Sequence, residues 1–179
     1  MKEVMVGKSV LQVVVGDITK QDTEAVVNAA NSQLAPGGGV AGAIHRAAGP
    51  ELWEECSQLG GCATGEAKIS KGYRLPNKYV IHTVGPVYRG RKEDAVLLRS
   101  CYLNSLKLAD MHAIQSIAFP ALSTGIFGYP VGEAAQVAFD AILEYLKGDT
   151  HIEIVRMVLY DEAAHQIHID YLDHWEHRA

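Results

Sequence analysis

Short apolar runs alternate along this chain with longer segments whose apolar residues recur every three or four positions. The short runs, many of them rich in β-branched residues, predict strands over 4–6, 10–15, 26–27, 67–70, 79–84, 116–119 and 152–160. The longer segments predict helices over 41–48, 50–59, 93–109, 134–145 and 162–175. Gly7-Lys8-Ser9 joins the first two strands and is typical of a β-hairpin. This order predicts a three-layer α/β/α sandwich with a mixed central sheet, in one domain that spans residues 1–179.

Polar and glycine residues gather where the predicted strands end. Asn28 and Asn31 follow the strand at 26–27, and the glycines at 37–39 then lead into the helix at 41–48. Glycine lets a ligand lie directly against the backbone, and a helix N-terminus favours an anion. The loop at 121–130 has the same position between a strand and a helix. Two such loops predict a site that holds a diphosphate between backbone amides, although the second is also compatible with an ordinary loop whose Phe127 turns inward.

The glycine loop also matches a second pattern, which its context disfavours. Gly37, Gly39 and Gly42 fit G-x-G-x-x-G, the fingerprint of dinucleotide-binding folds. That fingerprint has meaning only directly after a strand, whereas here a polar stretch and Pro36 intervene, and residues 58–66 form no second apolar strand. We therefore expect phosphate binding without nicotinamide chemistry.

Composition narrows the class of protein further. The chain is 48% hydrophobic and 21% charged, as soluble globular proteins are, and no apolar run or N-terminal signal pattern indicates a membrane segment. The net charge of −5 argues against broad nucleic-acid binding, which uses a basic surface. Three cysteines are an odd number and lack metal-ligand spacing, so they predict reduced thiols in a cytoplasmic protein.

Two groups of histidines need an interpretation. His82 lies within an apolar strand, and we expect a hydrogen-bonded core histidine rather than a catalytic base. Asp161, His165 and His168 share a face of the last helix, which would suit a metal. No fourth ligand is evident, so we expect neither a metal nor a cofactor.

Four motifs together resemble the macrodomain family, whose members bind ADP-ribose. They are Gly16-Asp-Ile-Thr19, Asn28-Ala-Ala-Asn31, Gly37-Gly-Gly-Val-Ala-Gly-Ala-Ile44 and Ser123-Thr-Gly-Ile-Phe-Gly128. Each motif alone is weak, but they occur in the family's order and span nearly the whole chain. The resemblance implies the macrodomain form of the sandwich predicted above.

The resemblance also implies where ADP-ribose would lie. The adenine would contact Asp17 and the amide of Ile18, with Tyr160 packed on its ring; the alternatives are that Asp17 caps a turn and that Tyr160 belongs to the core. The distal ribose would lie beside Asn31 and the glycine loop. The expected ligand contacts are Asp17, Ile18, Asn28, Asn31, Gly37, Gly38, Gly39, Val40, Ser123, Thr124, Gly125, Ile126, Phe127 and Tyr160.

The activity that the resemblance implies is hydrolysis of ADP-ribosyl esters. The enzyme would remove mono-ADP-ribose from acidic side chains of modified proteins, or acetate from O-acetyl-ADP-ribose. The strongly hydrolytic branch of the family has an aspartate directly after Gly-Gly-Val, where this chain has Ala41. Asn31 is therefore the expected catalytic residue, which orients water together with backbone groups and the substrate's phosphate. A non-catalytic ADP-ribose reader and an ADP-ribose 1″-phosphate phosphatase remain the alternatives.

Overall fold

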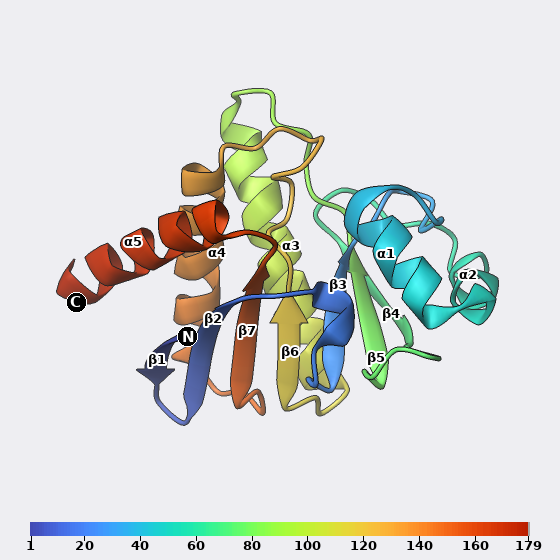
Figure 1. Ribbon diagram of the computed structural model, residues 1–179, viewed down its shortest axis with the longest axis horizontal. Helices are drawn as coiled ribbons and strands as arrows, with labels where there is room; N and C mark the ends of the chain where they lie inside the picture. Colours follow the sequence, from blue (N-terminus) through green and yellow to red (C-terminus); the bar gives the residue numbers. More distant parts are fainter. Residues whose placement is uncertain (179) are drawn as a thin grey trace.

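A single seven-stranded sheet forms the centre of the computed structural model, which describes residues 1–178 (Figure 1). The strands, in chain order, are β1 (Lys2–Val6), β2 (Ser9–Val15), β3 (Ala25–Ala29), β4 (Ala67–Lys71), β5 (Tyr79–Thr83), β6 (Ser116–Phe119) and β7 (Ile154–Leu159). Their order in the sheet is β1-β2-β7-β6-β3-β5-β4. The sheet thus joins the two ends of the chain, because β7 pairs with β2 over Val10–Val15 and Ile154–Leu159.

The sheet is mixed, as predicted, with a parallel centre and antiparallel edges. β2, β7, β6, β3 and β5 run in parallel, whereas β1 and β4 pair with their neighbours in the antiparallel sense. The arrows of β6 and β7 in Figure 1 accordingly point toward the same end of the molecule. The carboxyl ends of all five parallel strands lie at the same end of the sheet, which we call its carboxyl edge. The loops that follow these strands therefore lie together there.

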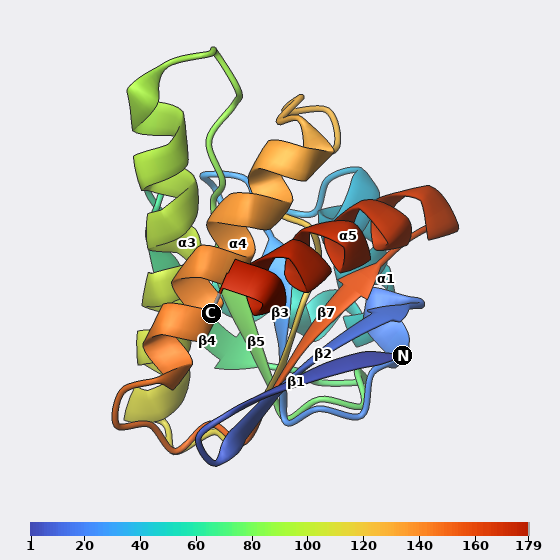
Figure 2. The ribbon, with the colours of Figure 1, turned by 90° about the vertical axis from the view of Figure 1, so that its left-hand side faces the viewer.

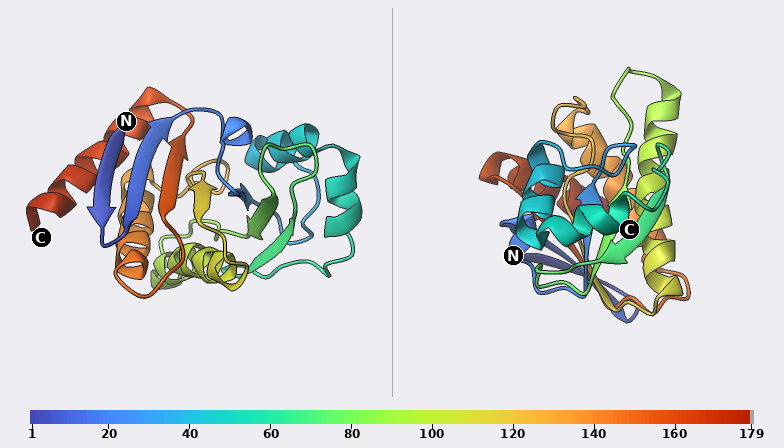
Figure 3. Two further views of the ribbon diagram at one scale, coloured as in Figure 1. Left: turned by 90° about the horizontal axis from the view of Figure 1, so that it is seen from below. Right: turned by 90° about the vertical axis from the view of Figure 1, so that its right-hand side faces the viewer.

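Helices cover both faces of the sheet, which confirms the predicted three-layer sandwich. α3 (Lys92–Met111), α4 (Val131–Leu146) and α5 (Glu162–Arg178) bury one face in the larger hydrophobic cluster, and Figure 2 shows α3 and α4 side by side. α1 (Gly39–Ala48) and α2 (Pro50–Cys56) cover part of the other face in a smaller cluster. Figure 3 shows the pairs α1/α2 and α3/α4 on opposite sides of the sheet.

The predicted elements all occur, with differences at their boundaries that have local causes. The strand expected at 26–27 is longer, because Asn28 and Ala29 continue the ladder opposite His82 and Thr83. The helix expected over 50–59 ends at Cys56, and the positive φ of Gly60 and Gly61 then redirects the chain. The last strand begins at 154 rather than at 152.

Two sequence-based expectations, on a membrane segment and on a metal site in the last helix, concern other parts of the molecule. Within residues 1–178, no helix is long and apolar enough to cross a membrane, and no three metal-binding side chains are grouped. Asp161 caps α5 by accepting from the N–H of Ala164 (2.8 Å). His168 is buried, and its Nδ1 lies 2.8 Å from the carbonyl of Ala164. His168 thus belongs to the packing of α5.

Candidate functional site

The loops at the carboxyl edge of the sheet bring most of the predicted site residues together. Asp17 and Ile18 follow β2, Asn31 and residues 37–40 follow β3, residues 123–127 follow β6, and Tyr160 follows β7. The N–H of Gly16 donates to the carbonyl of Leu159 (3.0 Å), which holds Asp17 beside Tyr160. The short 3-10 helix η1 (Ile18–Lys20) contacts α1. The four predicted segments therefore lie at the same end of the sheet, and we call the surface between them the cleft.

Asp17 is exposed at the rim of this cleft and also caps η1. Its Oδ1 accepts from the N–H of Thr19 (2.9 Å) and from the Thr19 hydroxyl (2.6 Å). The Thr19 hydroxyl and, secondly, the Thr19 N–H hold the pKa of Asp17 below its ordinary value, so the side chain is ionised at neutral pH. The capping alternative is thus correct for Oδ1. It does not conflict with ligand binding, because in the described residues Oδ2 has no partner.

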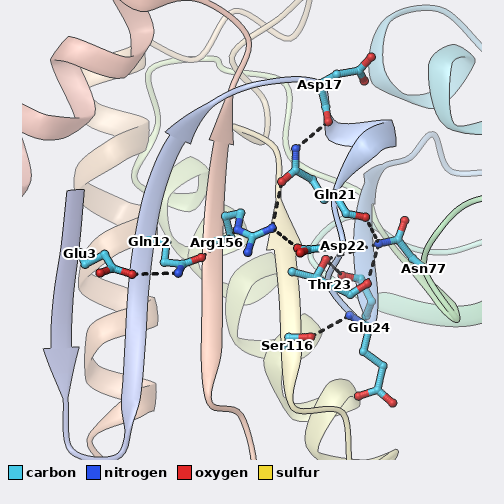
Figure 4. A network of polar contacts seen from close by, with 11 residues as sticks. Glu3, Gln12, Asp17, Gln21, Asp22, Thr23, Glu24, Asn77, Ser116 and Arg156 are labelled. Atoms are coloured by element: carbon cyan, nitrogen blue, oxygen red, sulfur yellow. Dashed lines mark hydrogen bonds and ion pairs between the residues drawn. The ribbon is translucent and has the colours of Figure 1, made fainter. Parts of the chain in front are cut away.

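A polar network fixes the segment that carries Asp17 (Figure 4). Gln21 donates through Nε2 to the Asp17 carbonyl (2.8 Å), and its Oε1 accepts from Arg156 (3.2 Å). Arg156, on β7, also donates to Gln12 (2.9 Å) and pairs with Asp22 (2.7 Å). In Figure 4 the Asp17 carboxylate points away from this network. The network therefore positions the Asp17 backbone and leaves the carboxylate available.

Replacing this carboxylate gives the first testable prediction. Asp17→Ala should weaken ADP-ribose binding by about 1–3 kcal/mol, because a donor on the ligand would lose its acceptor. Isothermal calorimetry measures the loss, with Glu144→Ala as the control, since Glu144 is an exposed carboxylate on α4 that pairs with Arg99. Equal losses in the two variants would show that charge alone, rather than a contact at Asp17, sets the affinity.

Tyr160 is 92% exposed at the end of β7, so the interpretation that places it in the core is wrong. Ile126, in the loop after β6, is 101% exposed. Single exposed apolar side chains are common on protein surfaces, so exposure alone does not mark a binding site. Both residues belong to loops at the carboxyl edge, where an aromatic base could cover Tyr160.

We expect Tyr160→Ala to lower ADP-ribose affinity by about 1 kcal/mol, the size of one aromatic pair beyond its buried area. Tyr160→Phe should keep the affinity, because the ring and not the hydroxyl makes the contact. Since the side chain is exposed, neither change should alter the melting temperature appreciably. Loss of affinity in both variants would instead indicate a hydrogen bond to the hydroxyl.

The first glycine loop presents free amides at the N-terminus of α1. Gly38 is the N-cap and offers no side chain, while Gly39 has φ +54°, a conformation that favours glycine. The N–H of Gly42 donates to the Gly38 carbonyl (3.1 Å), but the N–H groups of residues 39–41 have no partner among residues 1–178. Residues 37–39 are exposed. The helix terminus is therefore accessible to an anion.

Asn31 organises the start of the same loop. Its Oδ1 accepts from the N–H of Ala35 (2.9 Å) and its Nδ2 donates to the Ala35 carbonyl (2.8 Å). These bonds hold a turn in which buried Leu34 has φ +60°, a strained value for a side chain of this size. Since an amide has two donors and two acceptor positions, Asn31 keeps one of each for a ligand or water.

The loop after β6 presents a second set of amides. Ser123 has φ +66°, and its buried Oγ has no partner in the described chain. Carbonyls of the loop accept from Gly128, Tyr129 and Tyr88 at 2.8–3.0 Å, which fixes its shape. The N–H groups of Thr124, Gly125, Ile126 and Phe127 have no partner within residues 1–178. The loop thus resembles the first in offering donors without a charged side chain, and Phe127 is only partly buried.

Asn28 corrects the predicted set of ligand contacts. Its side chain is 1% exposed, so a ligand in the cleft cannot contact it directly. Its Nδ2 donates to Nδ1 of His82 (3.1 Å), and Nε2 of His82 lies 2.8 Å from Ser70 Oγ. Burial, with a smaller effect of His45, lowers the pKa of His82 to about 3. The expected core role of His82 is confirmed, and Asn28 belongs to the same buried row beneath the cleft.

Position 41 lies directly under the glycine loop. The side chain of Ala41 is buried, and its Cβ is 4.0 Å from the point that a Cβ on Gly37 would occupy. An acidic residue here would lie at the base of the loop, whereas alanine supplies no base. The site can therefore bind phosphate through amides and orient water through Asn31, but position 41 contributes no proton acceptor.

Comparisons with known proteins agree with this architecture. The family model of the Macro domain matches residues 27–138. A macro domain-containing protein of Chlorobaculum tepidum is 60% identical over 78% of this chain and 81% of its own length. ADP-ribose glycohydrolase MACROD1 of Bos taurus is 58% identical over 74% of this chain and 41% of its own length. A mutant of the Oceanobacillus iheyensis macrodomain, solved with ADPR, has a TM-score of 0.95 at 38% identity and covers 98% of both chains. This chain belongs to the macrodomain family.

Proposed function

We propose that this macrodomain binds ADP-ribose in the cleft and hydrolyses ADP-ribosyl esters. The proposed substrates are proteins modified by mono-ADP-ribose on acidic side chains, and O-acetyl-ADP-ribose. The observation that carries the proposal is the presence of two loops whose amide N–H groups, at 39–41 and 124–127, lack partners within the described chain. Amides at a helix N-terminus and in an exposed loop suit a diphosphate, even in a protein of net charge −5.

The ends of the cleft suit the two nucleoside ends of such a ligand. Asp17 offers an acceptor for an amino group, and Tyr160 offers an exposed ring for a base. At the other end, Asn31 offers one donor and one acceptor to a ribose hydroxyl or a water. Relatives support this assignment: the Oceanobacillus iheyensis protein has been solved with ADPR, and the bovine relative is named a glycohydrolase.

The proposed reaction needs few groups on the protein. For a modified protein, water attacks the anomeric carbon of the ribose, the bond between that carbon and the acyl oxygen breaks, and a carboxylate leaves while the water proton passes to the substrate's phosphate or to solvent. For O-acetyl-ADP-ribose, water attacks the acetyl carbonyl carbon, the bond between that carbon and the ribose oxygen breaks, and the ribose oxygen takes a proton and leaves as a hydroxyl. A carboxylate is a good leaving group, so orientation of the water by Asn31 and of the diphosphate by the loops would provide most of the acceleration. Without an acid at position 41, we expect slow turnover.

Two measurements test the proposal. Calorimetry should show a dissociation constant of about micromolar for ADP-ribose and much weaker binding of NAD, because a nicotinamide would crowd the glycine loop. Incubation with a glutamate-modified protein should release ADP-ribose. Equal affinity for the two nucleotides would contradict the site. Binding without release over hours would instead establish a reader, which Ala41 makes the main alternative.

A cytoplasmic location completes the proposal. Cys56, Cys62 and Cys101 are all free and buried, as is usual in a reducing compartment. Burial raises the pKa of both Cys56 and Cys62 to about 11, which makes these thiols unreactive. Fractionation of cells that express the protein tests the location.

A further inference from the structure

A pocket outside the cleft opens behind the first glycine loop. It is lined by Pro36, Gly37, His45, Arg46, Pro50 and Trp53, and its volume is about 330 Å³. This volume lies at the lower end of the range of about 300–1,000 Å³ that is typical of sites for small ligands. The walls come from the loop, from α1 and from α2. We call it the Arg46 pocket.

The cation of the pocket has no anion. Arg46 is exposed, and nothing in residues 1–178 gives its guanidinium an ion pair or a hydrogen bond. The neighbouring carboxylate of Glu51 pairs instead with Arg74 (3.7 Å). An arginine with five free donors beside an aromatic ring suits a carboxylate joined to a short aliphatic chain. Trp53, 37% exposed, and the two prolines supply the apolar wall for that chain.

His45 is a second polar side chain in the wall of the pocket. Its side chain is 6% exposed, and in the described chain neither Nδ1 nor Nε2 has a hydrogen-bond partner. A buried polar side chain without a partner is rare and requires a physical reason. Burial lowers the pKa of His45, so the ring is neutral and brings no second positive charge to the wall of the pocket.

Gly37 lines the pocket and also belongs to the glycine loop of the candidate site. A Cβ on Gly37 would lie 3.4 Å from Nδ2 of Asn31, on the side of the cleft. A Cβ on Gly42 would lie 2.2 Å from the Gly37 carbonyl and 3.0 Å from Nη1 of Arg46, on the side of the pocket. A single glycine backbone thus separates Asn31 from Arg46. A polypeptide attached to a ribose at Asn31 would reach Arg46 within one or two residues, at about 3.3 Å of extended chain per residue.

We propose that the Arg46 pocket binds an acidic side chain of the modified protein, next to the residue that carries ADP-ribose. The inference rests on the proposed function and adds to it a preference among substrates. Arg46 pairs with the carboxylate, and Trp53 covers the methylene groups. Free ADP-ribose and O-acetyl-ADP-ribose have no polypeptide and leave the pocket empty.

Two modified peptides test the proposal. Each carries one ADP-ribosylated glutamate, flanked on both sides by glutamate in one peptide and by glutamine in the other. Wild-type protein should show a kcat/KM about fivefold higher for the acidic peptide, as expected of one partly exposed charge pair. Arg46→Gln should remove this preference, and so should 1 M salt, which screens the pair. Arg99→Gln removes the same charge from α3, where Arg99 pairs with Glu144 and does not line the pocket, and it should keep the preference.

The outcomes separate this inference from the function on which it rests. If wild-type protein neither binds ADP-ribose nor releases it from any substrate, the proposed function fails. If it binds without turnover, calorimetric affinities for the two uncleaved peptides replace the rates, with the same expected ratio. Equal values for both peptides in wild type, or a preference that survives Arg46→Gln, would overturn the role of the pocket while the function stands.

Discussion

Asn31→Ala should slow the release of ADP-ribose from a glutamate-modified protein by about tenfold to a thousandfold, since each tenfold corresponds to about 1.4 kcal/mol of barrier. The reason is that Asn31 keeps one donor and one acceptor free after its two bonds to Ala35. With alanine at position 41, no carboxylate there can take over the orientation of water. Single-turnover assays with modified protein measure the rate, and calorimetry measures the affinity for ADP-ribose.

The structure adds a complication that a second variant resolves. Asn31 also holds the turn in which Leu34 has φ +60°, so alanine removes a support of the loop as well as a ligand contact. Asn31→Asp keeps the acceptor for the N–H of Ala35, loses the donor to the Ala35 carbonyl and adds a negative charge. If orientation by the donor is what matters, Asn31→Ala should be slow while its affinity falls much less than its rate. In Asn31→Asp the affinity for the diphosphate should fall as well, because the added charge repels it. A parallel fall of rate and affinity in Asn31→Ala alone would assign the residue to loop structure.

The position of the cleft was predictable, because it follows from where strands end. Short β-branched apolar runs locate the strands, and parallel strands put their carboxyl ends on one edge. Asp17, Asn31, the glycine loop and Tyr160 all follow such ends. The amides of the two loops were predictable for the same reason, since glycine-rich loops between a strand and a helix leave N–H groups without partners.

The partners of individual side chains were not predictable in the same way. Asn28 follows an apolar run and was expected in the cleft, but the ladder continues through it and places it opposite His82. The register with β5, rather than the residue type, decides that the side chain is buried. The alternation of Val26 and Asn28 on one face was a usable signal, because Val26 belongs to the cluster under α1.

The exposure of a side chain at the end of a strand or helix depends on contacts with distant segments, which sequence patterns do not reveal. Tyr160 is exposed because no other part of the described chain covers the end of β7, whereas an aromatic residue at a strand end is elsewhere often core. The Arg46 pocket is a second feature that could not be predicted from the sequence. It forms only because α2 turns back at Gly49, with φ +88°, and sets Trp53 and Pro50 against the glycine loop.

The glycine loop and α1 are packed so closely that one methyl group should disturb both folding and binding. A Cβ at Gly42 would lie 2.2 Å from the carbonyl oxygen of Gly37, a backbone atom that cannot rotate away. Gly42→Ala should therefore lower the free energy of unfolding by about 1–3 kcal/mol, the usual cost of overpacking, despite the better helix propensity of alanine. Since Gly37 must shift with its loop, ADP-ribose affinity should fall more than tenfold, or about 1.4 kcal/mol.

Gly132→Ala is the matched control, because it makes the same change in another helix. Gly132 lies in α4, where a Cβ would meet only Ile167, at an ordinary 3.8 Å. This variant should gain up to about 1 kcal/mol of stability from helix propensity and bind ADP-ribose as wild type does. Denaturant unfolding and calorimetry measure both quantities. If Gly42→Ala matched the control in stability and affinity, the loop would be free to move away from α1, and binding would not depend on the close contact between Gly37 and Gly42.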